Sequence, residues 1–295
     1  MAPPTGSVSG APVGASASGA SAVSAPLRLV LIGASGRMGQ QIVRTLPAFP
    51  SVRLTGAVAS ARSSALGRDV GTLAGVGELG IALHSELPSL LVNADLALDF
   101  SHAEAAANIL AACVAARVPL LIGTTGLGSE LEPALTAASR DIALLAAPNT
   151  SLGVTLLLEL VQHAARALPQ SYDIEIIESH HRGKRDAPSG TALALAEVAA
   201  ESRGGYLSQQ ACFARPRSGS GREAGQIGFA VVRGGDLIGE HQVLFLGEGE
   251  RLQLAHSATD RAVFARGALS AAQWLARQPP GRYVMRDYLF SNSKL

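Results

Sequence analysis

The stretch Leu27-Arg-Leu-Val-Leu-Ile-Gly33-Ala-Ser-Gly36-Arg-Met-Gly39 is a short apolar run that leads directly into three glycines. The apolar run predicts a strand, and residues 40–46 after the glycines are predicted to form a helix. Glycines at this spacing let the chain turn tightly, let a pyrophosphate approach the backbone and let the helix pack on the strand. The stretch therefore predicts the opening strand, turn and helix of a dinucleotide-binding domain.

Strand and helix signals continue to alternate beyond the glycine turn. They fall at residues 96–100, 103–116, 118–122 and 142–146. A glycine pattern alone is a weak signal in a chain with 32 glycines, and a purely structural turn is the alternative. The alternation favours an α/β fold in which a Rossmann-like dinucleotide-binding domain is built on a parallel sheet.

Small polar residues follow two of the predicted strands. Gly123-Thr124-Thr125-Gly126 comes after residues 118–122, and Ala147-Pro148-Asn149-Thr150 comes after residues 142–146. The carboxyl ends of the strands in an open parallel sheet form its ligand crevice, so both loops are predicted to line the nicotinamide pocket. Ordinary turn chemistry is the alternative for either loop taken singly, because Gly, Thr and Asn are common turn residues.

A second stretch, Glu178-Ser-His-His-Arg-Gly-Lys-Arg-Asp-Ala-Pro-Ser-Gly-Thr191, lies between a predicted strand at 173–178 and a predicted helix at 192–200. Pro188 stops the helix from extending backwards, and Ser189 or Thr191 can cap it. Backbone N–H groups are then left free at Gly190 and Thr191, and a helix start of this kind binds anions. The stretch predicts an active site that holds a dianion and protonates it, with a solvated basic loop as the alternative.

Lysine is scarce in this chain, which makes one lysine informative. Of the 24 Lys and Arg residues only Lys184 and Lys294 are lysine. An ammonium has a movable pKa and can give up a proton, whereas a guanidinium in practice cannot. The lysine within the basic stretch therefore indicates chemistry at position 184.

The composition restricts the classes of function. The chain has 295 residues with 47% hydrophobic content, enough for two domains of ordinary size or one large one, and its net charge of +1 gives no reason to invoke nucleic acid or a membrane surface. No segment is long and apolar enough to cross a bilayer without Gly, Pro or charge interrupting it. Cys113 and Cys212 lack Cys-x-x-Cys spacing and metal-ligand company, which predicts no metal site and reduced thiols in a cytoplasm. Residues 1–26 are almost wholly Ala, Ser, Gly, Pro and Val and predict a disordered extension.

Five motifs taken together resemble the dihydrodipicolinate reductase family, which reduces 4-hydroxy-tetrahydrodipicolinate in bacterial lysine biosynthesis. They are Gly33-Ala-Ser-Gly-Arg-Met-Gly39, Asp99-Phe-Ser101, Ile122-Gly-Thr-Thr-Gly126, Asn149 with Gly153, and Glu178-x-His-His-x-x-Lys-x-Asp-Ala-Pro-Ser-Gly-Thr191. The resemblance runs roughly from Leu27 to the C-terminus. It implies hydride transfer from NADPH or NADH to a cyclic dicarboxylate, followed by protonation.

The resemblance also implies an organisation of the chain. Residues 27–150 with 262–295 are expected to form the dinucleotide-binding domain, and 151–261 a second α+β domain on a mixed sheet that binds substrate. A homotetramer is expected to assemble through that second sheet. The last helix, predicted at residues 262–276, is expected to return to the nucleotide domain with Val263, Phe264, Leu269 and Trp274 on one face.

The resemblance assigns roles to individual residues. His180 and Lys184 are implied as the acid and base residues, although from physical chemistry alone His181 is equally eligible as the proton donor. Substrate carboxylates near the donor are expected to favour its imidazolium form. The residues implied to hold the substrate are His181, Gly190 and Thr191. Those implied to bind the cofactor are Gly33, Ala34, Ser35, Gly36, Arg37, Met38, Gly123, Thr124, Thr125, Ala147, Pro148, Asn149 and Thr150.

Three further side chains carry expectations of their own. Asp186 is predicted to orient the basic loop by bonding to backbone amides. Arg261 is predicted either to reach a substrate carboxylate or to lie in water. His256 has no partner pattern and is predicted to be structural or solvated.

The cofactor preference is predicted from the segment after the strand at residues 52–58. A dinucleotide domain that prefers NADH usually places an acidic residue there to bond the ribose hydroxyls, and this chain has Ala59. The 2′-phosphate of NADPH then loses a repulsive neighbour and gains Arg62, which predicts a lower KM for NADPH than for NADH. Two rival functions stay open at this point, namely another two-domain dehydrogenase and a nucleotide sensor without catalysis.

Overall fold

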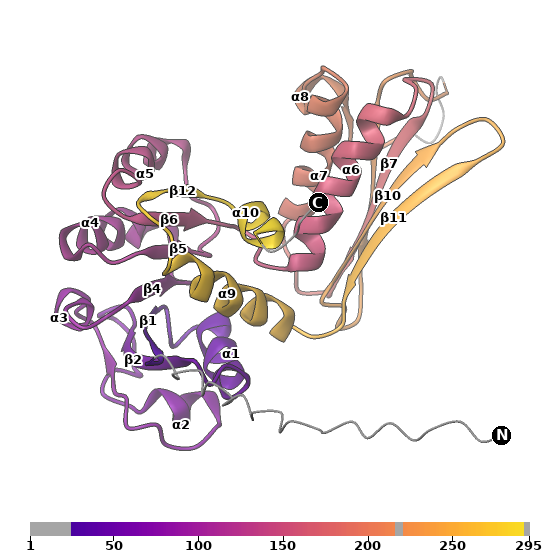
Figure 1. Ribbon diagram of the computed structural model, residues 1–295. Coiled ribbons are helices and arrows are strands. Elements are labelled where there is room, and N and C mark those ends of the chain that lie inside the picture. Colours follow the sequence, from indigo (N-terminus) through magenta and orange to yellow (C-terminus); the bar gives the residue numbers. More distant parts are fainter. Residues whose placement is uncertain (1–24, 216–220, 292–295) are drawn as a thin grey trace, which may run out of the picture.

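The computed structural model describes residues 25–215 and 221–291, and they form two lobes, each built on its own sheet (Figure 1). The predicted disordered extension lies outside the described residues except for its last two positions. No helix in the described part of the chain is long and apolar enough to span a membrane.

The first lobe is built on a parallel sheet with the strand order β12-β6-β5-β4-β1-β2-β3. Its strands are short and apolar because helices cover both faces, as parallel sheets require. The bounds are β1 Leu27–Ile32, β2 Val52–Val58, β3 Leu83–His84, β4 Leu96–Asp99, β5 Leu120–Ile122, β6 Ala143–Ala146 and β12 Gly281–Tyr283. The predicted α/β fold with a Rossmann-like sheet is confirmed.

Alternate side chains of β1 enter different cores on the two faces of this sheet. Leu29 and Leu31 join the core on the α1 and α9 face, whereas Val30 and Ile32 join the core beneath α4 and α5. The helices of this lobe are α1 Arg37–Thr45, α2 Val70–Ala74, α3 Pro88–Leu91, α4 Ala106–Ala116, α5 Glu132–Ala138, α9 Ala262–Leu275 and α10 Met285–Phe290, with short 3-10 turns at Leu46–Ala48, Ala103–Ala105 and Ser129–Leu131.

Helix α9 returns to the first sheet through a face made mainly of small residues. Leu269 is fully buried, and the half-buried Trp274 packs against the core of the first lobe, as predicted, whereas Val263 and Phe264 are half-buried outside that core. Small residues occur on this face because two segments of backbone approach closely. A Cβ added at Gly267 would lie 1.8 Å from the carbonyl oxygen of Thr150, so the contact requires a residue without a side chain.

The second lobe contains the mixed sheet β11-β10-β7-β9-β8, with one face covered by α6 and α7 (Figure 1). Alternation along β7 and β10 places Ile174, Ile176, Val243 and Phe245 in the core against these helices. The bounds are α6 Leu152–Ala167, β7 Asp173–His180, α7 Gly190–Ser202, α8 Leu207–Gln210, β8 Ala211–Cys212, β9 Ile227–Arg233, β10 Gly239–Leu246 and β11 Arg251–Ala258.

Candidate active site

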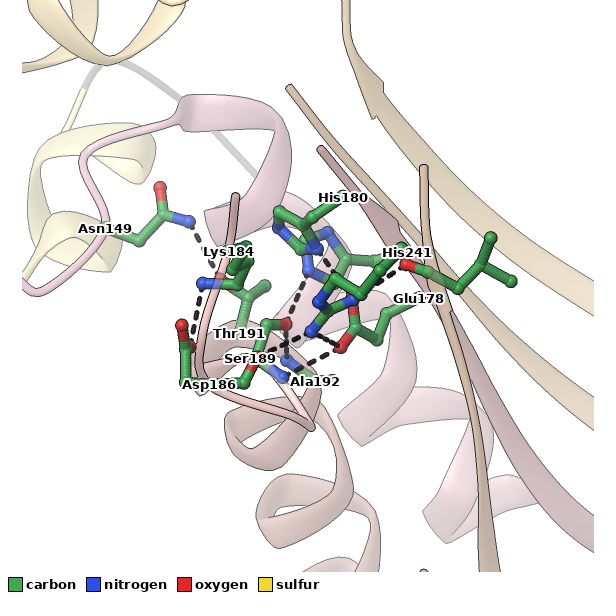
Figure 2. A network of polar contacts seen from close by, with 11 residues as sticks. Asn149, Glu178, His180, Lys184, Asp186, Ser189, Thr191, Ala192 and His241 are labelled. Atoms are coloured by element: carbon green, nitrogen blue, oxygen red, sulfur yellow. Dashed lines mark hydrogen bonds and ion pairs between the residues drawn. The ribbon is translucent and has the colours of Figure 1, made fainter. Parts of the chain in front are cut away.

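The basic loop joins the end of β7 to the start of α7, as the sequence predicted (Figure 2). Ser189 rather than Thr191 is the cap of α7, because its Oγ accepts a hydrogen bond of 3.2 Å from the backbone N–H of Ala192. The first-turn N–H groups of a helix have no partner within the helix. Gly190 is exposed and occupies that first turn, which leaves an anion-binding group at the end of the loop.

His180, the last residue of β7, is held by a buried carboxylate. Its Nδ1 lies 2.6 Å from Oε2 of Glu178, whose side chain is fully buried. Arg233 at the end of β9 donates to both oxygens of Glu178, at 2.8 and 2.7 Å, and Ser189 donates its backbone N–H to Oε1 at 3.0 Å. These contacts fix the carboxylate and, through it, the imidazole ring.

The charges around His180 act on its pKa in opposite directions. Burial lowers the pKa of His180, Glu178 raises it, and the nearby cations Lys184 and Arg233 lower it, with a net result below the usual value. Burial alone pushes the pKa of Glu178 up, but Arg233 and His180 bring it below its usual range. Without substrate, Glu178 is therefore ionised. The imidazolium form predicted for His180 then requires the negative charge of the substrate carboxylates.

A second buried histidine lies beside His180. The ring of His241 is in edge contact with that of His180 at a centroid distance of 5.1 Å, and its Nε2 lies 3.0 Å from Oγ of Ser189 (Figure 2). Burial lowers the pKa of His241 to about 4, so this ring is neutral near pH 7. Sequence reasoning gave it no role, although a histidine that alternates with the core residues Val243 and Phe245 is an unusual inward polar position.

Lys184 lies in the loop with its ammonium 2.7 Å from a carboxylate oxygen of Asp186. Asp186 was predicted to bond backbone amides; a bond from its own backbone N–H is among the contacts that lower its pKa, and the pairing with Lys184 was not predicted. Burial raises the pKa of Asp186, but the ammonium brings it below its usual value. Because the Asp186 side chain is 58% exposed, water screens this ion pair and the Lys184 charge stays accessible to an anionic ligand.

One predicted cofactor loop, the loop after β6, is hydrogen-bonded to the helix start that follows the basic loop. Asn149 donates its side-chain N–H to Oγ1 of Thr191 at 3.1 Å (Figure 2). Its own Oδ1 accepts the backbone N–H of Ser151. The bond to Thr191 joins the loop after β6 to the first turn of α7. The two predicted parts of the site are therefore adjacent.

Besides Asn149, two predicted cofactor residues use their side chains within the protein. Oγ1 of Thr124 donates to the buried carboxylate of Asp99 at 2.8 Å, and Oγ1 of Thr150 donates to the carbonyl oxygen of Phe264 at 2.7 Å. Ligand contacts from these positions are therefore left to the backbone. The exposed Thr125 and Pro148 retain side chains free to face the crevice.

The glycine turn lies on the same edge of the sheet as these loops, because it too follows the carboxyl end of a strand. Gly33 has a φ of +79°, and an added Cβ would lie 2.3 Å from the carbonyl oxygen of Phe100. Gly36 is exposed and caps α1, so no side chain covers the first-turn N–H groups of that helix. The turn thus fits the pyrophosphate of a dinucleotide.

The remaining predicted groups lie around this edge. Arg261 lines a surface pocket of about 400 Å³ together with Arg37, Met38 and Arg44 of α1, on the nucleotide side of the molecule.

Ala59 is buried directly after β2, and Arg62 is exposed in the turn that follows. His256 lies 3.4 Å from Oγ of Ser151, an internal contact in keeping with its predicted structural role. Among the described residues, no cluster of three or more His, Cys, Asp or Glu could hold a metal ion.

Both lobes match the same protein family. The family model described as the N-terminus of dihydrodipicolinate reductase matches residues 27–150, and that of its C-terminus matches 153–289. The 4-hydroxy-tetrahydrodipicolinate reductase of Anaeromyxobacter dehalogenans strain 2CP-1 is 47% identical over 262 residues, which are 89% of this chain and 97% of the relative. The protein of the same name from Sinorhizobium medicae is 48% identical and covers 89% and 97% of the two chains. A dipicolinate-bound dihydrodipicolinate reductase structure from Paenisporosarcina sp. TG-14 gives a TM-score of 0.70 at 26% identity, covering 88% of this chain and 97% of that one.

Proposed function

This chain belongs to the dihydrodipicolinate reductase family, and from that premise we propose how its residues reduce 4-hydroxy-tetrahydrodipicolinate. The enzyme is an NAD(P)H-dependent oxidoreductase that forms tetrahydrodipicolinate on the diaminopimelate route to lysine. The observation that carries the assignment of the site is the hydrogen bond between Asn149 and Thr191. It brings the loop predicted to face the nicotinamide against the helix start predicted to bind the substrate.

We place the cofactor along the edge of the first sheet, where the glycine turn and the loops after β5 and β6 lie. The first turn of α1 holds the pyrophosphate, with residues 33–38 around it. Backbone groups of residues 123–125 and 147–150 line the nicotinamide end, since Thr124 and Thr150 use their side chains internally. Once the substrate has lost its 4-hydroxyl group and a neighbouring proton as water, the bound reduced nicotinamide would supply a hydride to the ring carbon conjugated with the C=N.

The substrate carboxylates lie at the start of α7. The backbone N–H groups of Gly190 and Thr191, the imidazole of His181 and the ammonium of Lys184 neutralise them. Lys184 pairs with Asp186 in the structure. Because the Asp186 side chain is exposed, a carboxylate of the substrate can replace it as the partner of Lys184. Binding of this dianion adds negative charge beside His180 and favours its protonated form.

His180 is the general acid of the proposed reaction. Hydride addition leaves an electron-rich enamine, and the ring carbon next to the reduced one must receive a proton. His180 gives that proton and becomes neutral, while Lys184 balances the charge that develops on the substrate. His180 then recovers its proton from water.

The experiment is steady-state oxidation of NADPH with substrate supplied freshly by a coupled synthase. His180→Gln and Lys184→Ala should each lower kcat by about 10²-fold or more, because acid catalysis or charge stabilisation is lost. His163→Gln, an exposed histidine on α6, is the matched control and should turn over like the native enzyme. Near-native kcat for His180→Gln would remove the assignment of the acid. Tight NADPH binding without turnover by the native chain would favour a nucleotide sensor.

The organisation of the chain is proposed on the same premise. Residues 27–150 with 262–295 serve the nucleotide and 151–261 serve the substrate, and the enzyme acts in the cytoplasm as a homotetramer. The outer face of the second sheet supports this assembly. It carries apolar side chains at Ile177 and Leu244, and Val232 on β9 is 48% exposed, on the face that α6 and α7 do not cover.

A further inference from the structure

We propose that Glu178 is the positioning residue of the proton donor His180, and that Arg233 limits how strongly Glu178 favours the protonated ring. This inference rests on the proposed role of His180 and extends it to two residues outside the substrate-binding loop. Both lie on strands, Glu178 on β7 and Arg233 at the end of β9.

The first step concerns the two ring nitrogens of His180. Because Nδ1 lies 2.6 Å from a carboxylate that has no exposed surface, Nδ1 carries its hydrogen in both protonation states of the ring. The gained or lost proton is therefore the one on Nε2. That nitrogen lies next to Gly239 of β10, where an added Cβ would be only 3.0 Å away, so a side chain at position 239 would crowd the nitrogen that titrates.

The second step concerns what holds the carboxylate. The two-pronged contact with Arg233 and the bond from the Ser189 N–H leave Glu178 a single orientation. Arg233 also donates to the carbonyl oxygen of Asp186, at 2.7 Å. One guanidinium thus ties the sheet, the carboxylate and the basic loop together, and the ring of His180 takes its direction from that assembly.

The third step concerns charge. The groups that face His180 are Glu178 on its own strand, Lys184 in the loop, Arg233 on β9 and the neutral His241 on β10. Glu178 alone raises the pKa of His180, whereas burial, Lys184 and Arg233 lower it. Removing the carboxylate and removing the guanidinium must therefore displace the titration of His180 in opposite directions.

The test is the pH dependence of kcat with saturating substrate and NADPH for variants of Glu178 and Arg233, with a variant of Asp95 as the control. A general acid works while protonated, so kcat falls as the pH rises through the pKa of His180 in the bound complex. In Glu178→Gln this fall should move to lower pH by about one unit or more, with a lower kcat throughout. In Arg233→Met the fall should move to higher pH, because a cation that opposed protonation is gone. Asp95→Asn, which breaks a two-pronged Arg28 pair in the other lobe, is the control and should leave the profile in place.

A merely structural role makes a different prediction. Both variants would then lose activity and thermal stability without moving the fall in kcat, or would move it in the same direction, and either result overturns the inference. Glu178→Asp keeps the charge but shortens the reach, so it should retain the native position of the fall at reduced kcat. If Glu178→Gln does not fold, the upward displacement in Arg233→Met and the behaviour of Glu178→Asp decide the question.

The proposed acid and its positioning residue can fail separately. If His180→Gln keeps both its kcat and the fall at high pH, His180 is not the donor and the proposed function loses its acid. If His180→Gln loses activity as expected while neither Glu178→Gln nor Arg233→Met displaces the fall, only the role of Glu178 and Arg233 is wrong. KM for NADPH should stay native in Glu178→Gln, because neither residue lies on the nucleotide edge.

Discussion

Ser189 connects the proton donor, the second buried histidine and the helix start through two groups. Its backbone N–H bonds Glu178, and its Oγ accepts from Ala192 while lying 3.0 Å from His241. An Oγ that accepts from a backbone N–H has its own hydrogen available for the neutral His241. Movement of the α7 start therefore reaches the carboxylate that holds His180.

The cofactor preference is a prediction at the scale of single residues. Without a carboxylate at Ala59, KM should be lower for NADPH than for NADH, and Arg62→Ala should raise KM for NADPH by about tenfold through loss of a charge-assisted contact. KM for NADH should not change. The measurement is initial-rate kinetics with both cofactors, with Arg68→Ala as the control because it removes an exposed arginine a few residues away. A native preference for NADH, or an unchanged cofactor ratio in Arg62→Ala, would contradict it.

The site was predicted from sequence where its residues are neighbours in the chain. His180, Lys184 and Thr191 lie in one short stretch that runs from the end of β7 to the first turn of α7, and Pro188 and the cap signal the start of that helix. The partners that hold this loop come from other strands. Arg233 lies opposite His180 in the parallel register of β7 and β9, and His241 lies opposite Glu178 in the antiparallel register of β7 and β10. Strand register is not encoded in local spacing, so these two roles could not be predicted.

At the scale of elements, helix α9 carries a prediction through its closest contact. Gly267→Ala forces a methyl group against the carbonyl oxygen of Thr150, so the helix or the loop after β6 must move. The expected loss is about 1–3 kcal/mol of stability, together with weaker NADPH binding because the loop lies in the cofactor crevice. Calorimetric unfolding and a cofactor titration measure the two effects. Arg266→Ala, the exposed neighbour on α9, should change neither, and a native affinity and melting temperature for Gly267→Ala would show that the contact is not tight.

Element positions were predicted best where the apolar run and the strand coincide. Residues 52–58 form β2 as predicted, but the strand predicted at 118–122 begins only at Leu120. Val118 is occupied in closing α4, since its N–H bonds the carbonyl oxygen of Cys113 at 2.9 Å after Arg117 takes a left-handed conformation. A helix end and a strand start thus compete for the same residues, which apolar content alone does not resolve.

At the scale of the whole molecule, the proposed tetramer predicts a change of mass. Leu244→Glu places a charge in the middle of the outer face of the second sheet, where burial against another subunit would be costly. Sedimentation should then report dimers or monomers in place of tetramers. Leu156→Glu is the matched control, because Leu156 is a 43% exposed apolar residue on α6, whose helix covers the opposite face. A tetrameric Leu244→Glu protein would exclude this face as the contact.

Strand β12 and helix α10 come last in the chain but belong to the first lobe, so that lobe is completed last during translation. The second lobe is one continuous length of chain, whereas the first sheet receives its edge strand only from residues 281–283, through pairing with β6. Arg286 of α10 then joins Glu159 of α6 at 3.1 Å, across the two lobes. A ribosome therefore releases every residue of the second lobe before the first sheet is closed. Until then one edge of β6 is left unpaired in the nascent chain, and an open apolar edge of this kind can pair with another chain.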